Sequence, residues 1–238
     1  MNTLKIYRNL NYLVLITQRG NTEGEMNDEI TVKKLDRMSL IKPTIHFYSH
    51  KNKRMLFCES YFEVDCCLFR EFDSTIAAYT TQPTTYSYKY YGKTRTYTPD
   101  AIVEYTNGNV EFEEVKPPSE AVKPKFVTKF EFLQELHNTV IKIPLILNTG
   151  KFVSPIQKVN YEQLYNCLAL PFDADYWREC YDYLPTTISL FDLKELLKKS
   201  NIDEFIAFQL IAKNIYLTDL SQKLSLNSIL EKSHAKLS

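Results

Sequence analysis

The sequence lacks the features that mark several classes of protein. No run approaches the roughly 18 consecutive apolar residues of a membrane-spanning helix. The first residues, MNTLK, lack the basic-then-apolar start of a secretory signal. The cysteines number 5, none has C-x-x-C spacing, and the 4 histidines are scattered. These absences predict a cytoplasmic protein with reduced thiols, no membrane association, and no zinc or histidine-based metal site.

Charge is balanced over the whole chain but unevenly distributed along it. The 29 basic and 29 acidic residues give a formal net charge of zero. From Tyr161 onward, 11 acidic residues outnumber 8 basic ones, so the preceding part carries a slight basic excess. A mildly basic first part is compatible with nucleic acid, whereas the acidic second part is a poor DNA binder by itself.

Apolar periodicity and turn residues predict an α/β first part. The expected elements are a mostly buried helix over Phe57–Phe72, a strand meander over Thr75–Tyr105, a helix over residues 125–137 and a buried strand over residues 143–149. The apolar run Tyr12–Ile16 and a loop over residues 20–24 precede them without an assigned role. Residues 151–160 have the character of a linker, which divides the chain into domains 1–160 and 161–238.

The second domain shows the order of a winged helix. A helix is expected after Ser189 and a second after Asn201, followed by a short hairpin. The second helix would open with Asp203 and Glu204 and offers just Lys213. A recognition helix in the major groove instead presents Arg, Lys, Asn or Gln at its start. This domain is therefore expected to dock a protein partner.

One segment of the first domain places acids and a lysine around a predicted hairpin turn at Asn107-Gly108. Glu114 and Lys116 face the same way on their strand, because side chains two residues apart share a face. A two-residue turn would put Ala101 opposite Glu114, whereas a three-residue turn with left-handed Gly108 would put Asp100 there. Apolar matching leaves both registers open, and the bulged register is the functional hypothesis.

Such a grouping suits phosphodiester hydrolysis with a metal ion. A hard cation prefers carboxylate oxygens, and a positive group stabilises the charge that develops on the phosphate. The alternative is a solvated surface hairpin with weak ion pairs. Glu63, in an apolar helical stretch, favours the site because a buried acid needs a partner.

Wider motifs point to a known family. Pro99-Asp100 and Glu114-Val115-Lys116 form the PD-(D/E)xK nuclease pattern. The blocks FCESYFEVDCCLFREFD, TTQPTTYSY, RTYTPDAIV and EEVKP resemble, in order, those of the TnsA family, the endonuclease subunit of heteromeric transposases. Phe62 departs from the usual Leu of the first block. The resemblance covers residues 52–116 and implies a restriction-endonuclease-like core, with a mixed sheet flanked by helices, plus a small C-terminal winged-helix domain.

The resemblance also implies roles for individual residues. The catalytic set would be Glu63, Asp100, Glu114 and Lys116. Asp100 and Glu114 would hold Mg²⁺, for which Mn²⁺ could substitute, and Glu63 would reach it directly or through bound water. Lys116 would orient or help deprotonate the attacking water.

Further expectations rest on sequence position. Glu59, one helical turn before Glu63, is the lesser candidate for the same role, and Ser60 contributes to helix capping or packing. Glu111 and Glu113 alternate away from Glu114 and are expected to be solvated. Lys93 and Arg95 are candidates for DNA contacts, as are Lys123 and Lys125, for which a solvated helix face is the equal alternative.

The function implied is a Mg²⁺-dependent DNA endonuclease that cleaves the 5′ ends of a transposon. It would act beside a DDE transposase, with an AAA+ ATPase regulator docked on the C-terminal domain, in the bacterial cytoplasm at the nucleoid. A stand-alone restriction-type or resolvase-type nuclease would need no partner and would have a more basic second domain. A non-catalytic adaptor would keep the fold and lack cleavage.

Overall fold

The computed structural model describes residues 32–33, 44–150 and 154–233. The expected features at Tyr12–Ile16 and at residues 20–24 lie outside these residues. The chain divides into two compact units, one of residues 1–67 and 73–150, the other of residues 68–72 and 151–238. Within the described ranges, no helix has the length and apolar character needed to cross a membrane.

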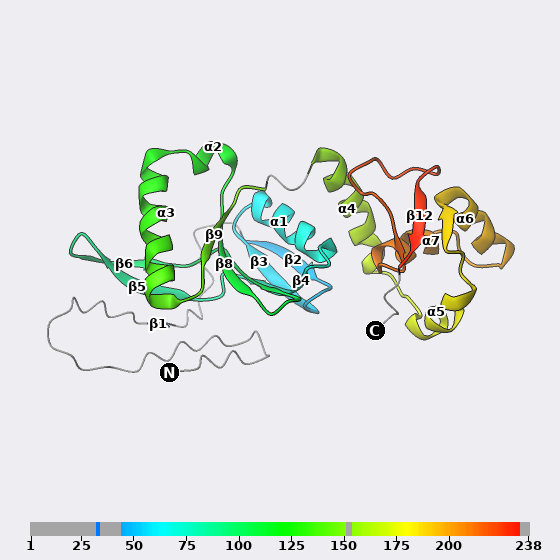
Figure 1. Ribbon diagram of the computed structural model, residues 1–238, viewed down its shortest axis with the longest axis horizontal. Helices are drawn as coiled ribbons and strands as arrows, with labels where there is room; N and C mark the ends of the chain where they lie inside the picture. The colour runs from blue at the N-terminus through cyan, green and yellow to red at the C-terminus, as the bar shows by residue number, and fades with distance from the viewer. Residues whose placement is uncertain (1–31, 34–43, 151–153, 234–238) are drawn as a thin grey trace. The chain divides into compact units, whose positions relative to one another are not determined.

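The first unit is built on a mixed four-stranded sheet flanked by helices, as predicted (Figure 1). β4, β7 and β8 pair antiparallel, and β9 is parallel to β8. The strands are β4 (Ile76–Thr81), β7 (Ala101–Tyr105), β8 (Val110–Val115) and β9 (Leu145–Asn148). The helices are α1 (Tyr61–Phe72), whose residues 68–72 are assigned to the second unit, α2 (Pro118–Ala121) and α3 (Pro124–Leu136). The strand and helix expected over residues 143–149 and 125–137 are thereby confirmed.

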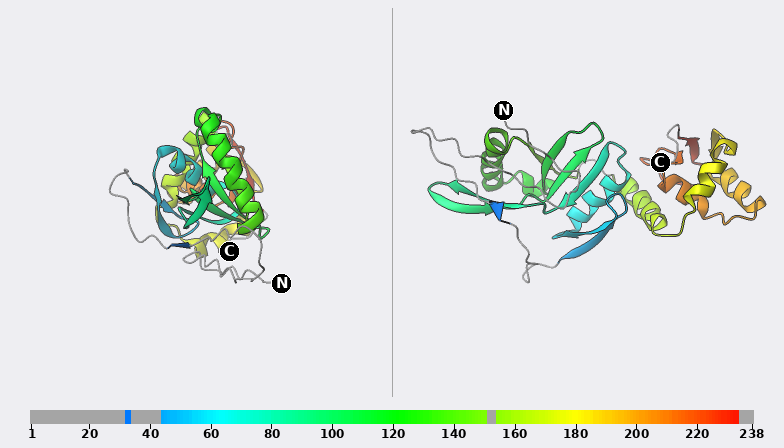
Figure 2. Two further views of the ribbon diagram at one scale, coloured as in Figure 1. Left: turned by 90° about the vertical axis from the view of Figure 1, so that its left-hand side faces the viewer. Right: turned by 90° about the horizontal axis from the view of Figure 1, so that it is seen from below.

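Two smaller groups of strands complete this unit. The strands β2 (Ile45–Ser49) and β3 (Arg54–Cys58) form a hairpin. A second hairpin joins β5 (Thr85–Tyr90) to β6 (Lys93–Tyr97), and the short β1 (Val32–Lys33) pairs with β5. Figure 2 shows the blue β1 beside this hairpin, which extends away from the four-stranded sheet. The strands of the expected meander are thus present, but β5 and β6 pair in a separate sheet with β1 rather than in the four-stranded sheet.

The start of the first helix corrects a prediction. Phe57 and Cys58 belong to strand β3, and α1 begins at Tyr61. The side chain of Ser60 accepts a hydrogen bond from the backbone N–H of Glu63 at 3.2 Å, which confirms its capping role. The apolar pattern of residues 57–72 therefore continues across a strand, a cap and a helix.

A cluster of buried aromatic and aliphatic side chains lies between α3 and the strands. Helix α3 contributes Phe130, Leu133 and Leu136, which recur at helical spacing. The strands contribute, among others, Tyr86 and Phe112. This cluster fixes α3 against the strands that carry the candidate site.

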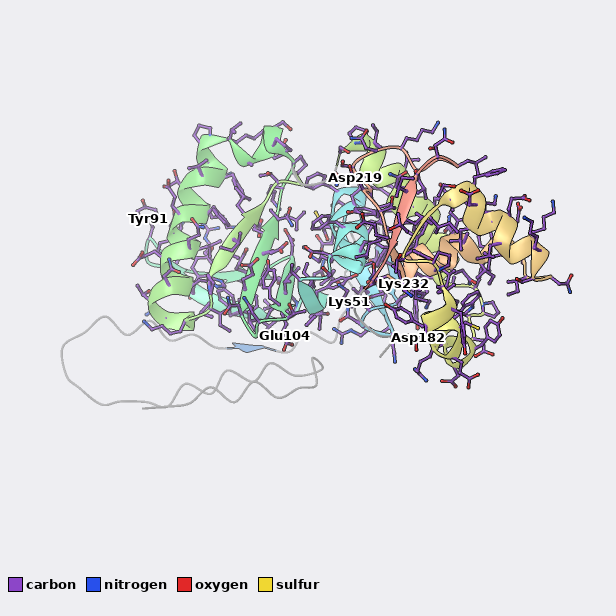
Figure 3. All side chains as sticks on the ribbon, turned by 45° about the vertical axis from the view of Figure 1, so that its right-hand side comes forward. Lys51, Tyr91, Glu104, Asp182, Asp219 and Lys232 are labelled. Carbon is purple, nitrogen blue, oxygen red and sulfur yellow. The ribbon has the colours of Figure 1, made fainter. Side chains whose placement is uncertain are left out.

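The second unit has its own buried core and a three-stranded antiparallel sheet. Its elements are α4 (Pro155–Leu168), α5 (Ala174–Cys180), η2 (Tyr181–Tyr183), β10 (Thr187–Ser189), α6 (Leu190–Lys199), α7 (Ile206–Ala212), β11 (Tyr216–Leu217) and β12 (Ile229–Lys232). Ser189 caps α6, so the helix expected after it is confirmed. Lys232, labelled in Figure 3, donates to the carbonyl groups of Tyr181 and Leu184.

Three details of this unit differ from expectation. The predicted linker is helical from Pro155 onward, because Ser154 and Gln157 form a reciprocal capping box. Helix α7 begins at Ile206, so Asp203 and Glu204 precede it in a turn. Residues 218–228 separate β11 from β12, which makes the terminal hairpin longer than predicted.

Candidate active site

The turn between β7 and β8 has the bulged register. Ala101 pairs with Glu113 and Ile102 with Phe112, which is the pairing of a three-residue loop. Gly108 has a φ of 85°, a left-handed conformation that glycine adopts without steric cost, and its N–H donates to the Tyr105 carbonyl. The predicted register is therefore confirmed, and it places Asp100 opposite Glu114.

Asp100 is held at the end of this strand pair by the neighbouring backbone. Its Oδ2 accepts a hydrogen bond from the Val115 N–H at 2.7 Å. Its own carbonyl accepts from the N–H of Gln82 at 2.9 Å. The carboxylate therefore points toward β8, on the side where Glu114 and Lys116 lie.

Lys116 bridges the two carboxylates. Its Nζ lies 2.8 Å from Glu114 Oε1 and 3.4 Å from Asp100 Oδ2. The three side chains are partly or largely shielded from water, with Lys116 the most exposed at 32%. Two acids and one ammonium group thus converge, as the sequence predicts.

Burial and charge shift the ionisation of this group. Burial raises the pKa of Asp100, and with the nearby charge of Glu114 it brings that pKa to about 6, although Lys116 and the Val115 N–H oppose the shift. Burial by itself lowers the pKa of Lys116, but the charges of Asp100 and Glu114 outweigh it and raise the pKa. The two carboxylates therefore stabilise the ammonium form of Lys116 in this arrangement.

Glu63 is held at the N-terminus of α1. It is 8% exposed, and its carboxylate accepts hydrogen bonds from the Glu59 N–H and the Ser60 hydroxyl, each at 2.9 Å. The negative charge of Glu63 also raises the pKa of Asp100, so the two carboxylates interact electrostatically. Glu59 precedes the helix and supports Glu63 through its backbone N–H.

The donor set suits a hard divalent cation. The ammonium group of Lys116 occupies a point on which oxygens of both Asp100 and Glu114 converge. Mg²⁺ is commonly held by one or two carboxylates, with water and substrate phosphate as further ligands. Among the residues that the structure describes, no three His, Cys, Asp or Glu side chains form a group that could hold a metal ion. The arrangement therefore offers two carboxylates, with Glu63 engaged at its own helix end.

The other acids of β8 differ from expectation in one case. Glu113 is buried and accepts a 2.7 Å hydrogen bond from the Asn148 amide, so the prediction that it is solvated is wrong. The reason is that β8 lies inside the sheet and residues 112–115 are buried on both faces. Glu111 is partly exposed and accepts a hydrogen bond from the Tyr105 hydroxyl.

The predicted DNA-contacting residues are all exposed but do not form one group. Lys93 and Arg95 lie on β6. Lys123 and Lys125 flank the start of α3, where Lys123 pairs with Glu120 at 2.6 Å. Most of the tyrosines between residues 79 and 105 pack inward, whereas Tyr91, labelled in Figure 3, is 86% exposed at the turn of the β5–β6 hairpin.

Sequence reasoning missed a tyrosine at this site. The hydroxyl of Tyr97 donates to Glu114 Oε2 at 2.5 Å, and burial, followed by the charge of Glu114, raises the pKa of the phenol far above its usual range. Beside it, the Tyr86 hydroxyl lies 2.6 Å from His137 Nε2. The one signal available in the sequence is the position of Tyr97 directly before the Thr98-Pro99-Asp100 motif.

Comparison with known proteins bears on the same segment. No curated protein sequence matches the chain. Residues 73–139 match a family model described as TnsA-like endonuclease N terminal. This segment is therefore similar to the N-terminal part of TnsA-like endonucleases, which confirms the predicted resemblance, and it includes Asp100, Glu114 and Lys116.

Proposed function

We propose that the chain is a Mg²⁺-dependent DNA endonuclease that hydrolyses one strand at each 5′ end of a transposon, leaving a 3′-hydroxyl and a 5′-phosphate. The observation that carries this proposal is the convergence of Asp100, Glu114 and Lys116 within a segment similar to TnsA-like endonucleases. Mn²⁺ is expected to substitute for Mg²⁺, because both accept carboxylate and water oxygens.

Each residue of the group has a distinct role in this proposal. Asp100 and Glu114 hold the cation through carboxylate oxygens, and Glu63, whose two oxygens accept hydrogen bonds at the start of α1, supports it through bound water. When bound, the cation supplies a water of lowered pKa and neutralises charge on the scissile phosphate. Lys116, released from the two carboxylates, donates to the phosphate oxygens or orients the attacking water.

The DNA is proposed to run past the β5–β6 hairpin. Residues 85–98 carry three cations, Lys89, Lys93 and Arg95, and no acid. All three side chains are exposed. The hairpin leads through Tyr97 directly into the Asp100 segment, so a strand bound along it would lie close to the carboxylates. Lys123 and Lys125 are further candidates for phosphate contacts.

Partner proteins are proposed to bring the enzyme to its substrate. The second unit is acidic in balance, and the turn before α7 presents Asp203 and Glu204 rather than base-reading side chains. A winged-helix role in docking an AAA+ regulator, beside a DDE transposase that makes the 3′ cuts, suits this charge. The isolated chain should therefore show little stable DNA binding, and tight, salt-resistant, sequence-specific binding would contradict that part of the proposal.

The test is nicking of transposon-end DNA by the full chain with its partner proteins. Asp100→Asn removes the negative charge and keeps an oxygen that can accept from the Val115 N–H, so it separates catalysis from folding. Cleavage should require Mg²⁺ and should be lost in this variant. The matched change Asp182→Asn, at an exposed acid of η2 outside the turn before α7, should leave cleavage intact.

Three outcomes would count against the proposal. Cleavage that survives Asp100→Asn would end the catalytic assignment. Assembly with the partners without any Mg²⁺-dependent cleavage by the wild-type chain would indicate a nuclease-like adaptor. Rapid cleavage without partners would instead indicate a stand-alone nuclease.

A further inference from the structure

The carboxylate of Glu114 has a different partner at each of its two oxygens. Oε1 lies 2.8 Å from Lys116 Nζ, which also reaches Asp100. Oε2 accepts the hydrogen bond from the Tyr97 hydroxyl at 2.5 Å. Oε1 therefore faces the position that Lys116 Nζ occupies between Glu114 and Asp100, whereas Oε2 is hydrogen-bonded to Tyr97, to which the proposed function gives no role.

Tyr97 is fixed more firmly than a surface tyrosine. It is 6% exposed, and its ring contacts Tyr86 at a centroid distance of 5.5 Å. The ammonium group of Lys129 lies 5.5 Å from the centroid of its ring. Because the ring cannot turn freely among these neighbours, its hydroxyl holds Glu114 Oε2 in one direction.

We propose that Tyr97 is a positioning residue for the metal site, which orients Glu114 so that Oε1 alone binds the divalent cation shared with Asp100. The inference rests on the proposed function, because it assumes that Glu114 is a metal ligand. Hydrogen-bonding partners of ligating carboxylates fix the ligand's orientation, and their loss commonly weakens metal binding. A phenylalanine would fill the same space without the hydrogen bond.

The structure supplies a matched control in the neighbouring strand. Tyr86 pairs directly with Tyr97 across the β5–β6 hairpin and is equally buried. Its hydroxyl is also hydrogen-bonded to a buried side chain, but that partner is His137 rather than a site carboxylate. Tyr97→Phe and Tyr86→Phe therefore remove the same group from the same cluster, and just one of them touches the site.

The experiment is a calorimetric titration of Mn²⁺ into the metal-free full chain, for wild type and both variants. Tyr97→Phe should weaken Mn²⁺ binding by about 10–100-fold. Tyr86→Phe should leave Mn²⁺ binding close to that of wild type, because the hydroxyl of Tyr86 bonds His137 rather than Glu114. In the nicking reaction with partner proteins, raising the Mg²⁺ concentration should restore the rate of Tyr97→Phe, because its defect is in metal affinity.

Several results would overturn the inference. Equal Mn²⁺ affinity in Tyr97→Phe and wild type would do so, as would equal losses in the two variants, which would indicate a packing effect. No Mn²⁺ binding by wild type would remove the proposed function as well, so the two failures are distinguishable. If Tyr97→Phe does not fold, a crystal structure of the wild-type chain with Mn²⁺ decides the question. Glu114 should then bind through Oε1 alone with the Tyr97 bond intact, and two-oxygen coordination would refute the inference.

Discussion

Acidification should destabilise the first unit through one buried histidine. His137 lies at the end of α3, at the start of the π-helical turn η1 (His137–Ile141), and is fully buried. Its Nδ1 lies 3.0 Å from the Ile143 carbonyl, which can only accept, so Nδ1 carries the proton. The neutral ring then accepts at Nε2 from the Tyr86 hydroxyl. Both ring nitrogens are satisfied in the neutral form.

The size of the effect follows from the shift of this pKa. Burial lowers the pKa of His137 from 6.5 to about 4, although the bond to Ile143 opposes the shift. The unfolded chain therefore binds more protons than the folded chain between these values, and stability falls as the pH drops through this window. At about 1.4 kcal/mol for each pH unit, the full loss is about 3 kcal/mol. That is a large fraction of the roughly 5–15 kcal/mol typical of a folded domain.

Guanidinium unfolding at pH 7, 6, 5 and 4 measures this loss. His137→Gln should have a lower free energy of unfolding than wild type at pH 7. Between pH 7 and pH 4, its free energy of unfolding should fall by about 3 kcal/mol less than that of wild type, because the titrating imidazole is gone. Far-UV circular dichroism follows both units, whereas the fluorescence of the single tryptophan, Trp177, reports the second unit and serves as an internal reference. Parallel pH dependence in wild type and variant would refute the reasoning, as would an imidazolium ¹⁵N spectrum for His137 at pH 6.

Three further outcomes are expected. Gly150→Ala should destabilise the first unit by at least about 1–2 kcal/mol, because Gly150 has a φ of 65° and an added Cβ would lie 2.5 Å from Cζ of Phe62. Phe62 directly precedes Glu63, so the nicking rate should also fall. Thermal melts and cleavage rates measure the two effects, and an unchanged melting temperature would contradict the prediction. The double variant Lys93→Glu, Arg95→Glu should weaken DNA binding by the assembled complex. The slope of log K against log salt concentration should become shallower by about 0.9 for each phosphate that is no longer neutralised. An unchanged slope would exclude the β5–β6 hairpin from the DNA path. Asn160→Ala should lower the free energy of unfolding of the second unit, followed by Trp177 fluorescence, by about 1–3 kcal/mol and leave the first unit unchanged. The reason is that the Asn160 side chain hydrogen-bonds two carbonyl groups and one N–H of the loop before β12. A change confined to the first unit would refute this.

Much of the site could be predicted from local sequence. The Asn107-Gly108 turn, combined with the requirement that Asp100 face Glu114, gave the observed register. The start of α1 could also have been predicted from the sequence, since Ser60-x-x-Glu63 has the spacing of a capping box. The apolar residues before Ser60 instead favoured an earlier start. Apolar spacing over a few residues is compatible with a strand and a helix alike.

The errors come from features that depend on distant parts of the chain. Glu113 alternates away from Glu114 and so looks solvated, but β8 lies between β7 and β9 in the sheet, and its residues 112–115 are buried. Nothing near Glu113 in the sequence indicates its partner Asn148, which lies on β9. The bond from Tyr97 to Glu114 likewise joins two different sheets. Local pattern therefore brings Asp100 and Glu114 together with Lys116 but leaves their supporting partners unassigned.

The position of Asp100 at the end of a strand pair links folding to the proposed metal site. Backbone pairing of β7 with β8 reaches Ala101 and Glu113. Beyond that point the Val115 N–H donates to the Asp100 carboxylate instead of to a backbone carbonyl. The same oxygen, Oδ2, faces Lys116. A cation bound at this oxygen would therefore share it with a backbone donor, which keeps the carboxylate oriented before the cation arrives. Alanine at this position would remove a structural acceptor together with the charge, so asparagine is the substitution whose effect can be assigned to chemistry.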